Sequence, residues 1–244
     1  MHQYFGINIE FNHNKFENTV NEISSVGKGY SCFVDSTLLV LSHREKGDRL
    51  RYILNGACAN SCDGSHVALM ASILHKEKLK AYNGPEFFNK FIYYPDKQCI
   101  IGNTEDVFLR IKRKIELTGM DSSNLKYIPT PYLSIDEFDY ESLANEINQF
   151  GPRYIWVSLG APKQEEFMSR IIPFIDKGVL IGVGAALNYF SGEIKNIPKW
   201  ATKMNLIWFF RIMTEPKKQL YRSLMIFAST PGIFLKEYKR IIRK

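Results

Sequence analysis

The sequence predicts an α/β fold with a Rossmann-like, largely parallel sheet, flanking helices and a small helical, basic C-terminal appendage. Short β-rich apolar runs alternate with stretches of helical periodicity through the first four-fifths of the chain. The 244 residues are 45% hydrophobic and 23% charged, as in a soluble globular protein, which excludes a disordered or fibrous chain. The charge becomes strongly basic near residue 193. We therefore expect an α/β core at 1–192 and an appendage at 193–244.

Four apolar runs are the expected strands. Each has four to six residues and is bounded by segments of different character. Helical patterns separate them, which is the arrangement that gives a largely parallel sheet. The runs are Tyr30–Val34, Gln98–Ile101, Tyr154–Leu159 and Val179–Val183.

Apolar residues at helical spacing predict four helices. Thr104 is a suitable N-cap before an acidic first turn, and Gly119 would close that helix. Gly151-Pro152 would stop another. Pro162 suits the first turn of the last helix, whose apolar stripe continues despite Pro173. The stripes are Val67–Leu74, the segment after Thr104, Tyr140–Ile147 and Phe167–Ile175.

The appendage carries the positive charge of the chain. Residues 193–244 contain 12 basic and 3 acidic residues, a net charge of +9, which leaves about −2 on the rest. Tryptophan, tyrosine and phenylalanine lie among these lysines and arginines, in a pattern that predicts two or three short helices. We expect a helix break just before Pro216, because proline is best tolerated in a first turn. A basic tail indicates an anionic partner: a lipid headgroup, a nucleic acid or a phosphorylated substrate.

The cysteines and the N-terminus indicate a cytosolic protein. The four cysteines form no C-x-x-C pair, so we expect free thiols in a reducing compartment. The N-terminal segment lacks the features of a signal peptide. The longest weakly polar run, Ser223–Leu235, is shorter than the ~20 residues of a membrane span, which leaves peripheral attachment open. The cysteines are Cys32, Cys58, Cys62 and Cys99.

Three segments have the form of ligand-binding loops at the carboxyl ends of strands. In the first, residues 157–166, a strand ends at a glycine and a helix opens with Lys163, Gln164 and Glu165. A helix N-terminus with a lysine suits a phosphate, while Gln and Glu can bind a base or a sugar. The alternative is an exposed first turn whose glutamates only interact with the helix dipole.

The second segment, residues 179–188, is a buried strand followed by two glycines and ending at Asn188. Gly182 and Gly184 would let backbone N–H groups approach a ligand. The segment is not a G-x-G-x-x-G motif, because Leu187 occupies the third glycine position. Nicotinamide binding is therefore disfavoured.

The third segment is a turn that leads into a helix at residues 60–66. Asp63 before Gly64 is either a turn former or N-cap, or a general base if desolvation raises its pKa. His66 is the alternative base. The chain has no D-x-D pair, so we expect no metal and no cofactor. A diphosphate would be held by cations of the tail, which offers Arg211, Lys217, Lys218 and Arg222.

These segments together resemble the WecG/TagA/CpsF family of bacterial glycosyltransferases, glycosyltransferase family 26. The family pattern V-x-L-G-x-P-K-Q-E matches Val157–Glu165 at every fixed position. Further matches are an upstream D-G at Asp63-Gly64, a G-V-G pattern at Gly182–Gly192 and an L-x-W-x-x-R-x-x-x-E-P pattern at Leu206–Pro216. A strand followed by glycine ends at Asn103.

Some positions depart from the family pattern. Ala81 stands where the family usually has arginine, with Lys80 beside it, and Asn196 and Ile207 replace residues of the R-A-P and L-E-W elements. The nearest counterparts of the family's T-x-N element are Asp35, Ser36 and Thr37, of which Thr37 is selected as a binding residue. These departures bear on the sugar and the acceptor, which the sequence does not identify.

The resemblance implies a metal-independent, inverting transfer of an N-acetylhexosamine, hexose or uronic acid from a UDP-sugar. The acceptor would be a polyprenyl-diphosphate-linked saccharide for a capsule, O-antigen, exopolysaccharide or teichoic acid. The implied place is the cytoplasmic face of the cell membrane, where the basic appendage closes the site and touches anionic lipid. The oligomeric state is open, and a homo-oligomer is compatible with the sequence.

The residues fit this chemistry. Displacement at an anomeric carbon needs a base for the acceptor hydroxyl, for which we select Asp63, and cations for the leaving diphosphate. UDP is expected between the first turn at Lys163–Glu165 and the Gly182–Asn188 loop. The remaining predicted binding residues are Thr37, Asn103, Arg211, Lys218 and Arg222. The alternatives are a non-catalytic UDP-binding scaffold and a basic module that stacks on single-stranded nucleic acid.

Overall fold

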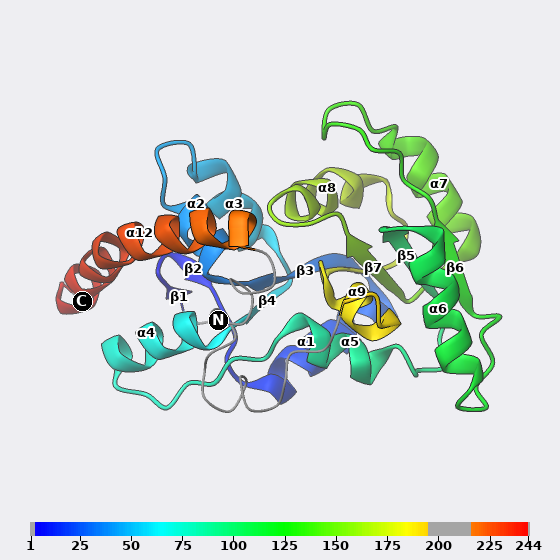
Figure 1. Cartoon of the computed structure of the whole chain (residues 1–244), viewed down its shortest axis with the longest axis horizontal. Helices are drawn as coiled ribbons and strands as arrows, with labels where there is room; N and C mark the ends of the chain where they lie inside the picture. The colour runs from blue at the N-terminus through cyan, green and yellow to red at the C-terminus, as the bar shows by residue number, and fades with distance from the viewer. Residues whose placement is uncertain (1–2, 195–215, 244) are drawn as a thin grey trace.

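A six-stranded parallel sheet forms the centre of the protein, as the sequence predicts (Figure 1). The computed structural model describes residues 3–194 and 216–243, with the backbone alone at 216–219. Along the sheet the strands follow the order β4-β3-β8-β7-β5-β6. The strands are β3 (Lys28–Val34), β4 (Ala59–Cys62), β5 (Gln98–Gly102), β6 (Leu125–Ile128), β7 (Tyr154–Ser158) and β8 (Gly178–Gly182).

The strand order reverses between β3 and β8. The chain moves outward from β3 to β4, crosses to the other half of the sheet, and returns through β7 to β8 beside β3. The register pairs Cys32 with Gly182, so the two strands end almost level. In open parallel sheets, ligands bind outside the carboxyl ends of the strands at such a reversal.

Helices cover both faces of the sheet (Figure 1). Alternate strand residues enter the two cores: Ile155 and Val157 face one, whereas Tyr154 and Trp156 face the other. One core receives α2 (Ser36–Ser42), α3 (Asp48–Gly56), α4 (Ser65–His75), α7 (Tyr140–Phe150), α8 (Lys163–Ile171) and α12 (Pro216–Ile242). The other receives α1 (His13–Val26), α5 (Gly84–Phe91), α6 (Glu105–Glu116) and α9 (Ala186–Ser191).

The four predicted strands and four predicted helices are confirmed, with small shifts at their ends. Thr104 caps α6 by accepting a hydrogen bond from the Val107 N–H at 3.3 Å. The stripe predicted to run on to Ile175 is wrong beyond Ile171, where a 3₁₀ turn over Ile172–Phe174 replaces the α-helix. Pro173 accounts for this change, because proline lacks the N–H that the α-helical ladder needs.

Strand β4 was not predicted, because its sequence is polar although all four of its residues are buried. Side-chain hydrogen bonds make this burial possible. Asn60 donates to the Asn8 and Leu54 carbonyls at 2.8 and 2.6 Å, and the Ser61 hydroxyl donates to the Tyr82 carbonyl at 2.8 Å. The N-terminal hairpin, β1 (Gln3–Tyr4) and β2 (Ile7–Asn8), leads into this edge of the sheet.

The described part of the appendage is one long helix. The expectation of two or three short helices is wrong for α12, which runs unbroken for 27 residues against α2 and α4. Pro231 is tolerated inside it on the exposed side. Residues 195–215, including Arg211, lie outside the described part of the chain. Within the described residues, no helix is long and apolar enough to cross a membrane. The division at residue 193 stays a prediction.

The four cysteines are free thiols, as predicted. Cys32, Cys62 and Cys99 are buried, and burial raises the pKa of each thiol. They therefore behave as small apolar core residues at neutral pH.

A buried carboxylate fastens the C-terminal end of α12. Glu237 is 2% exposed and accepts hydrogen bonds from His75 Nε2 at 3.0 Å and from the Arg240 guanidinium at 2.7 and 2.9 Å. Burial alone would raise the pKa of Glu237, but Arg240, the backbone of Phe5 and His75 outweigh it and lower that pKa. Arg240 also donates to the Gln3 carbonyl, so the cluster joins α12, α4 and the N-terminal hairpin.

We predict that Glu237→Gln lowers the free energy of unfolding by about 2 kcal/mol at pH 7, because Arg240 and His75 lose a buried anionic partner. A lowered carboxyl pKa stabilises the fold above the unfolded value of 4.5, and this contribution is lost as pH falls through the folded value. Urea unfolding should therefore show a smaller difference between the two proteins in acid. The control is Glu22→Gln on exposed α1 surface. Equal stability of the two variants at pH 7 would contradict the fastening role.

Candidate active site

The parallel sheet gathers most of the predicted site residues at one edge. Asp35 follows β3, Asp63 follows β4, Asn103 follows β5 and Gly184 follows β8. Because all six strands are parallel, their carboxyl ends meet at the same edge. Residues that lie up to about 150 positions apart in the sequence thus become neighbours of one surface.

The glycine turn after β8 lies directly against Gln164 of α8. A Cβ added to Gly182 would come within 2.8 Å of Met168 Cε and 3.0 Å of Gln164 Nε2. At Gly184, where φ is +51°, the same addition would lie 3.5 Å from Gln164 Oε1. The two segments expected to lie around UDP are therefore in contact, and a side chain at position 182 would require the ends of the Met168 and Gln164 side chains to shift.

Gln164 and Glu165 form a buried polar pair beneath this turn. Their side chains are 4% and 0% exposed, and Gln164 Nε2 donates to Glu165 Oε1 at 2.9 Å. Gln164 Oε1 and Glu165 Oε2 have no hydrogen-bond partner within the described part of the chain. Burial raises the pKa of Glu165 to about 7, opposed by the Gln164 hydrogen bond. The alternative of an exposed first turn does not hold for these two residues.

Lys163 makes a different contact from the phosphate contact expected of it. Its ammonium group donates to the Leu133 carbonyl and lies 5.2 and 5.5 Å from the ring centres of Phe138 and Tyr132. The lysine therefore ties the loop before α7 to the first turn of α8. A phosphate would have to compete with this carbonyl and the two rings for the ammonium group.

Asn103 and Asn188, which were selected from separate motifs, contact each other. Asn103 Nδ2 donates to Asn188 Oδ1 at 2.9 Å and to Ser158 Oγ at 3.3 Å. The Ser158 hydroxyl in turn donates to the Gly184 carbonyl at 2.8 Å. Asn103 has a φ of +66°, a conformation that asparagine tolerates better than most residues. These bonds join the ends of β5, β7 and β8 in one network.

Arg222 of α12 reaches the end of β3. Its guanidinium forms an ion pair with Asp35 Oδ2 and a hydrogen bond with the Thr37 hydroxyl. The other Asp35 oxygen caps α2 by accepting from the Leu38 N–H at 2.8 Å. Asp35 belongs to the segment that the sequence analysis matched to the T-x-N element, but only Thr37 of that segment was selected as a binding residue, although an aspartate directly after a buried strand is a usable signal. Arg222 and Thr37, predicted separately, meet here.

Asp63 lies beside this group. Its backbone N–H donates to the Val34 carbonyl at 2.9 Å, which sets the end of β4 against the end of β3. After burial, the charges of Asp63 and Asp35 contribute to the raised pKa of Cys62, so both carboxylates lie near that thiol. Gly64, with a φ of +94°, then opens α4.

His66, the alternative base, is also close to the end of β3. His66 Nδ1 is 2.9 Å from Ser36 Oγ. Burial lowers the pKa of His66, which favours the neutral ring. The geometry therefore keeps His66 as a second proton acceptor near Asp63.

Two predicted cations are only partly located. The side chain of Lys218 is outside the described atoms, but its backbone lies one turn before Arg222 on α12, as the i, i+4 spacing predicts. Arg211 lies outside the described residues. Among the residues described, no three His, Cys, Asp or Glu side chains are grouped so as to hold a metal ion.

Comparison with known proteins adds a family and several relatives. A model described as the glycosyl transferase WecG/TagA/CpsF family matches residues 3–243. A Bacillus subtilis protein is 27% identical over 158 residues, and a Bacillus spizizenii protein is 23% identical over 184. These alignments cover 63% and 70% of this chain and 60% and 66% of the relatives, so the chain spans less than two-thirds of either.

A Staphylococcus aureus protein is 32% identical over 87 residues, which are 36% of this chain and 33% of that protein. All three relatives are named N-acetylglucosaminyldiphosphoundecaprenol N-acetyl-beta-D-mannosaminyltransferase. The family match covers nearly the whole chain and includes the motifs that meet at the carboxyl edge of the sheet. The chain belongs to the WecG/TagA/CpsF family of glycosyl transferases.

Proposed function

We propose that this protein is an inverting glycosyltransferase that moves a sugar from a UDP-sugar to a polyprenyl-diphosphate-linked saccharide. The product would serve a bacterial cell-surface polysaccharide. The observation that carries the proposal is the meeting of the family's motif residues at the reversal point of the sheet, around an orphaned buried amide and a glycine turn. The names of the relatives favour N-acetylmannosamine as the sugar and N-acetylglucosaminyl diphosphoundecaprenol as the acceptor.

The donor fits between β8, α8 and β5. The turn at Gly182–Gly184 packs against Gln164, whose Oε1 atom offers an unsatisfied acceptor for an N–H or hydroxyl of the donor. Asn103 and Asn188 supply amides on the adjoining side. In this placement Lys163 would exchange its contact with the Leu133 carbonyl for a phosphate of the donor. Glu165 orients Gln164 through the hydrogen bond between them.

The reaction is a single displacement at the anomeric carbon. The acceptor hydroxyl oxygen forms the new bond as the bond from carbon to the UDP phosphate oxygen breaks, and Asp63 takes the hydroxyl proton. Arg222, with Lys218 and Arg211, would neutralise the departing diphosphate. Arg222 is pre-positioned by Asp35 and Thr37, so an incoming diphosphate exchanges one anionic partner for another.

The outer face of α12 supports attachment to an anionic membrane on its cytoplasmic side. Large apolar side chains recur on this face at intervals of three, four or eight residues, and each is more than half exposed. Lysines and arginines flank them, which is the pattern of a helix that lies in a membrane interface. The apolar residues are Leu220, Leu224, Phe227, Leu235, Tyr238 and Ile242.

A donor screen tests the proposed function. Purified protein is incubated with UDP-N-acetylmannosamine and other UDP-sugars plus a short-chain polyprenyl-diphosphate N-acetylglucosamine, and released UDP is measured. Transfer that survives EDTA supports a mechanism without a metal or cofactor. UDP binding without any transfer would favour the non-catalytic scaffold. Salt-sensitive retention on RNA with no UDP binding would favour the nucleic-acid module.

We predict that Asp63→Asn lowers turnover by about 10² to 10⁴-fold, because the amide cannot accept the hydroxyl proton. UDP affinity and the thermal midpoint should stay close to those of the wild type. Asp176→Asn is the matched control, because that exposed residue precedes β8 at the opposite edge of the sheet. Turnover within a few-fold of wild type would assign the base to His66 or to the segment after β3.

We predict that Lys163→Ala and Gln164→Ala each weaken UDP-sugar binding by roughly tenfold. The first variant loses an ammonium group for the donor phosphate, and the second loses a hydrogen bond to the donor. Calorimetric titration measures the affinity, and thermal melting checks that the fold remains. Gln149→Ala, on the exposed surface of α7, is the control for the amide. Wild-type affinity in both variants would discard this placement of the donor.

We predict that Leu224→Glu/Leu235→Glu reduces partitioning onto anionic vesicles by about a hundredfold. The reason is that each leucine contributes about 1.5 to 3 kcal/mol when it inserts into the apolar region of the membrane. UDP affinity should not change. Leu109→Glu/Leu117→Glu makes the same change on exposed residues of α6 and the turn after it. Undiminished vesicle binding by the α12 variant would remove the membrane role from this face.

A further inference from the structure

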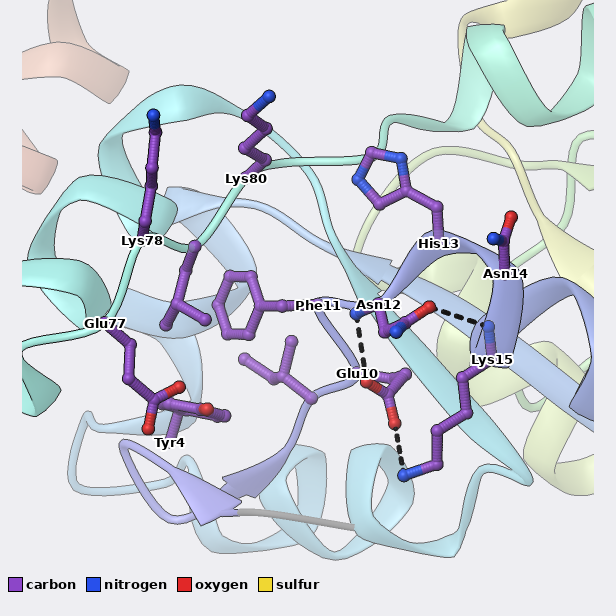
Figure 2. A pocket seen from close by; sticks show the side chains of 12 residues that line it. Tyr4, Glu10, Phe11, Asn12, His13, Asn14, Lys15, Glu77, Lys78 and Lys80 are labelled. Carbon is purple, nitrogen blue, oxygen red and sulfur yellow. Dashed lines mark hydrogen bonds and ion pairs between the residues drawn. The ribbon is translucent and has the colours of Figure 1, made fainter.

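A cavity of about 570 Å³ lies outside the site described so far, between the segment that enters α1 and the loop that follows α4 (Figure 2). Its size is that of a site for a small molecule or sugar. One wall is formed by residues 9–15 and the other by residues 77–80, with Tyr4 at the base. None of the motifs that define the donor site contributes to it.

The lower part of the cavity is apolar and aromatic. Phe11 and Tyr4 pack edge to face with ring centres 4.8 Å apart, and Ile9 and Leu79 extend the apolar surface. Figure 2 shows the Phe11 ring lying between the two walls. The C–H face of a sugar ring packs well on such a surface, because it is the least polar part of the sugar.

The charges around the cavity are unequally satisfied. The Glu10 carboxylate pairs with Lys15 at 2.9 Å and accepts from the Asn12 N–H at 3.0 Å, and burial together with the nearby charge of Glu77 raises the pKa of the Tyr4 hydroxyl. Lys78 and Lys80, on the opposite wall, form no ion pair with any residue that the structure describes. The Glu10 carboxylate is therefore engaged within the protein, whereas two ammonium groups are available to an anion.

His13 adds a second unsatisfied group across from Lys80 (Figure 2). Its ring stacks on Tyr82 with centres 4.4 Å apart, which fixes its orientation. His13 Nε2 is buried and has no hydrogen-bond partner among the described residues. An orphaned polar atom of this kind indicates a partner outside the described residues, and a ligand in the cavity can supply it.

Both walls are attached to the strand that carries Asp63. The Glu10 N–H donates to the Asn60 carbonyl at 2.8 Å, and the Tyr82 N–H donates to the Cys62 carbonyl at 2.9 Å. These bonds lie on the outer edge of β4, whereas β3 and β8 follow on its inner side. The cavity and the glycine turn thus lie on opposite sides of Asp63. A base that serves a displacement must stand between the donor and the acceptor hydroxyl.

We propose that this cavity binds the saccharide-diphosphate head of the acceptor, with the sugar against Phe11 and the phosphates against Lys78 and Lys80. The inference rests on the proposed function and adds the acceptor subsite to it.

The test compares Lys78→Glu/Lys80→Glu with the wild type in vesicle-free buffer, using farnesyl-diphosphate-linked N-acetylglucosamine as the soluble acceptor. We expect the acceptor KM to rise roughly tenfold, because two charge-assisted contacts become repulsive, while the donor KM stays unchanged. Lys78→Arg/Lys80→Arg should restore the acceptor KM. Lys46→Glu/Lys177→Glu makes the same charge change on exposed lysines elsewhere and should have no effect.

Direct titration of the acceptor against each protein keeps the inference separate from catalysis. Acceptor binding that is lost only in the Lys78/Lys80 charge reversal supports the subsite even if no sugar is transferred, in which case the proposed function fails by itself. An unchanged acceptor KM and affinity in that variant would overturn the subsite. Loss of binding to anionic vesicles with unchanged affinity for the soluble acceptor would also overturn it, since the lysines would then contact a lipid surface.

Discussion

The pairing of β3 with β8 is the constraint on which the rest of the site depends. These strands are separated by more than 140 residues, yet their register sets Cys32 opposite Gly182 and ends them almost level. The turn that carries Asp35 therefore lies beside the glycine turn, and α8 can place Gln164 beneath the latter. A slip of one residue would exchange the faces of β8 and bring a larger side chain against Met168 and Gln164.

Helix α12 depends on two electrostatic contacts at different ends. Near its start, Arg222 binds Asp35 and Thr37 at the site, and near its end, Glu237 binds His75 and Arg240 away from it. The first contact is about a quarter exposed on each side, whereas Glu237 is nearly inaccessible. The buried contact fixes the helix to the core, and the more exposed one is positioned to exchange partners with a ligand.

The fold class could be predicted because its strands and several helices carry strong local patterns. Tyr154–Ser158 and Gly178–Gly182 are apolar runs, and Thr104 marks the start of α6. Strand β4 could not be predicted, because its burial depends on hydrogen bonds from Asn60 and Ser61 to distant carbonyl groups. Short helices were expected after residue 193, whereas α12 continues through Pro231, which lies on its exposed side.

The site could be predicted in composition but not in detail. Motifs indicated Gln164, Asn103 and Arg222. The common edge of a parallel sheet explains the position of the first two, whereas Arg222 reaches Asp35 from α12. The sequence could not show that Arg222 forms an ion pair with Asp35, or that Lys163 donates to the Leu133 carbonyl, because both contacts depend on how loops fold. The cavity beside β4 was also beyond prediction, because it is formed by two segments, distant in the sequence, that both hydrogen-bond to that strand.

The buried carboxyl of Glu165 couples the occupancy of the site to protons. Its pKa is about 7 in the folded protein against 4.5 for an unburied glutamate, so unfolding releases a proton between these values and stability falls as pH rises through that window. Its Oε2 atom is orphaned in the described structure. Any ligand that directs a hydrogen-bond donor at this atom favours the ionised form, and its binding then expels a proton into the solvent. The affinity of such a ligand would therefore increase with pH near neutrality.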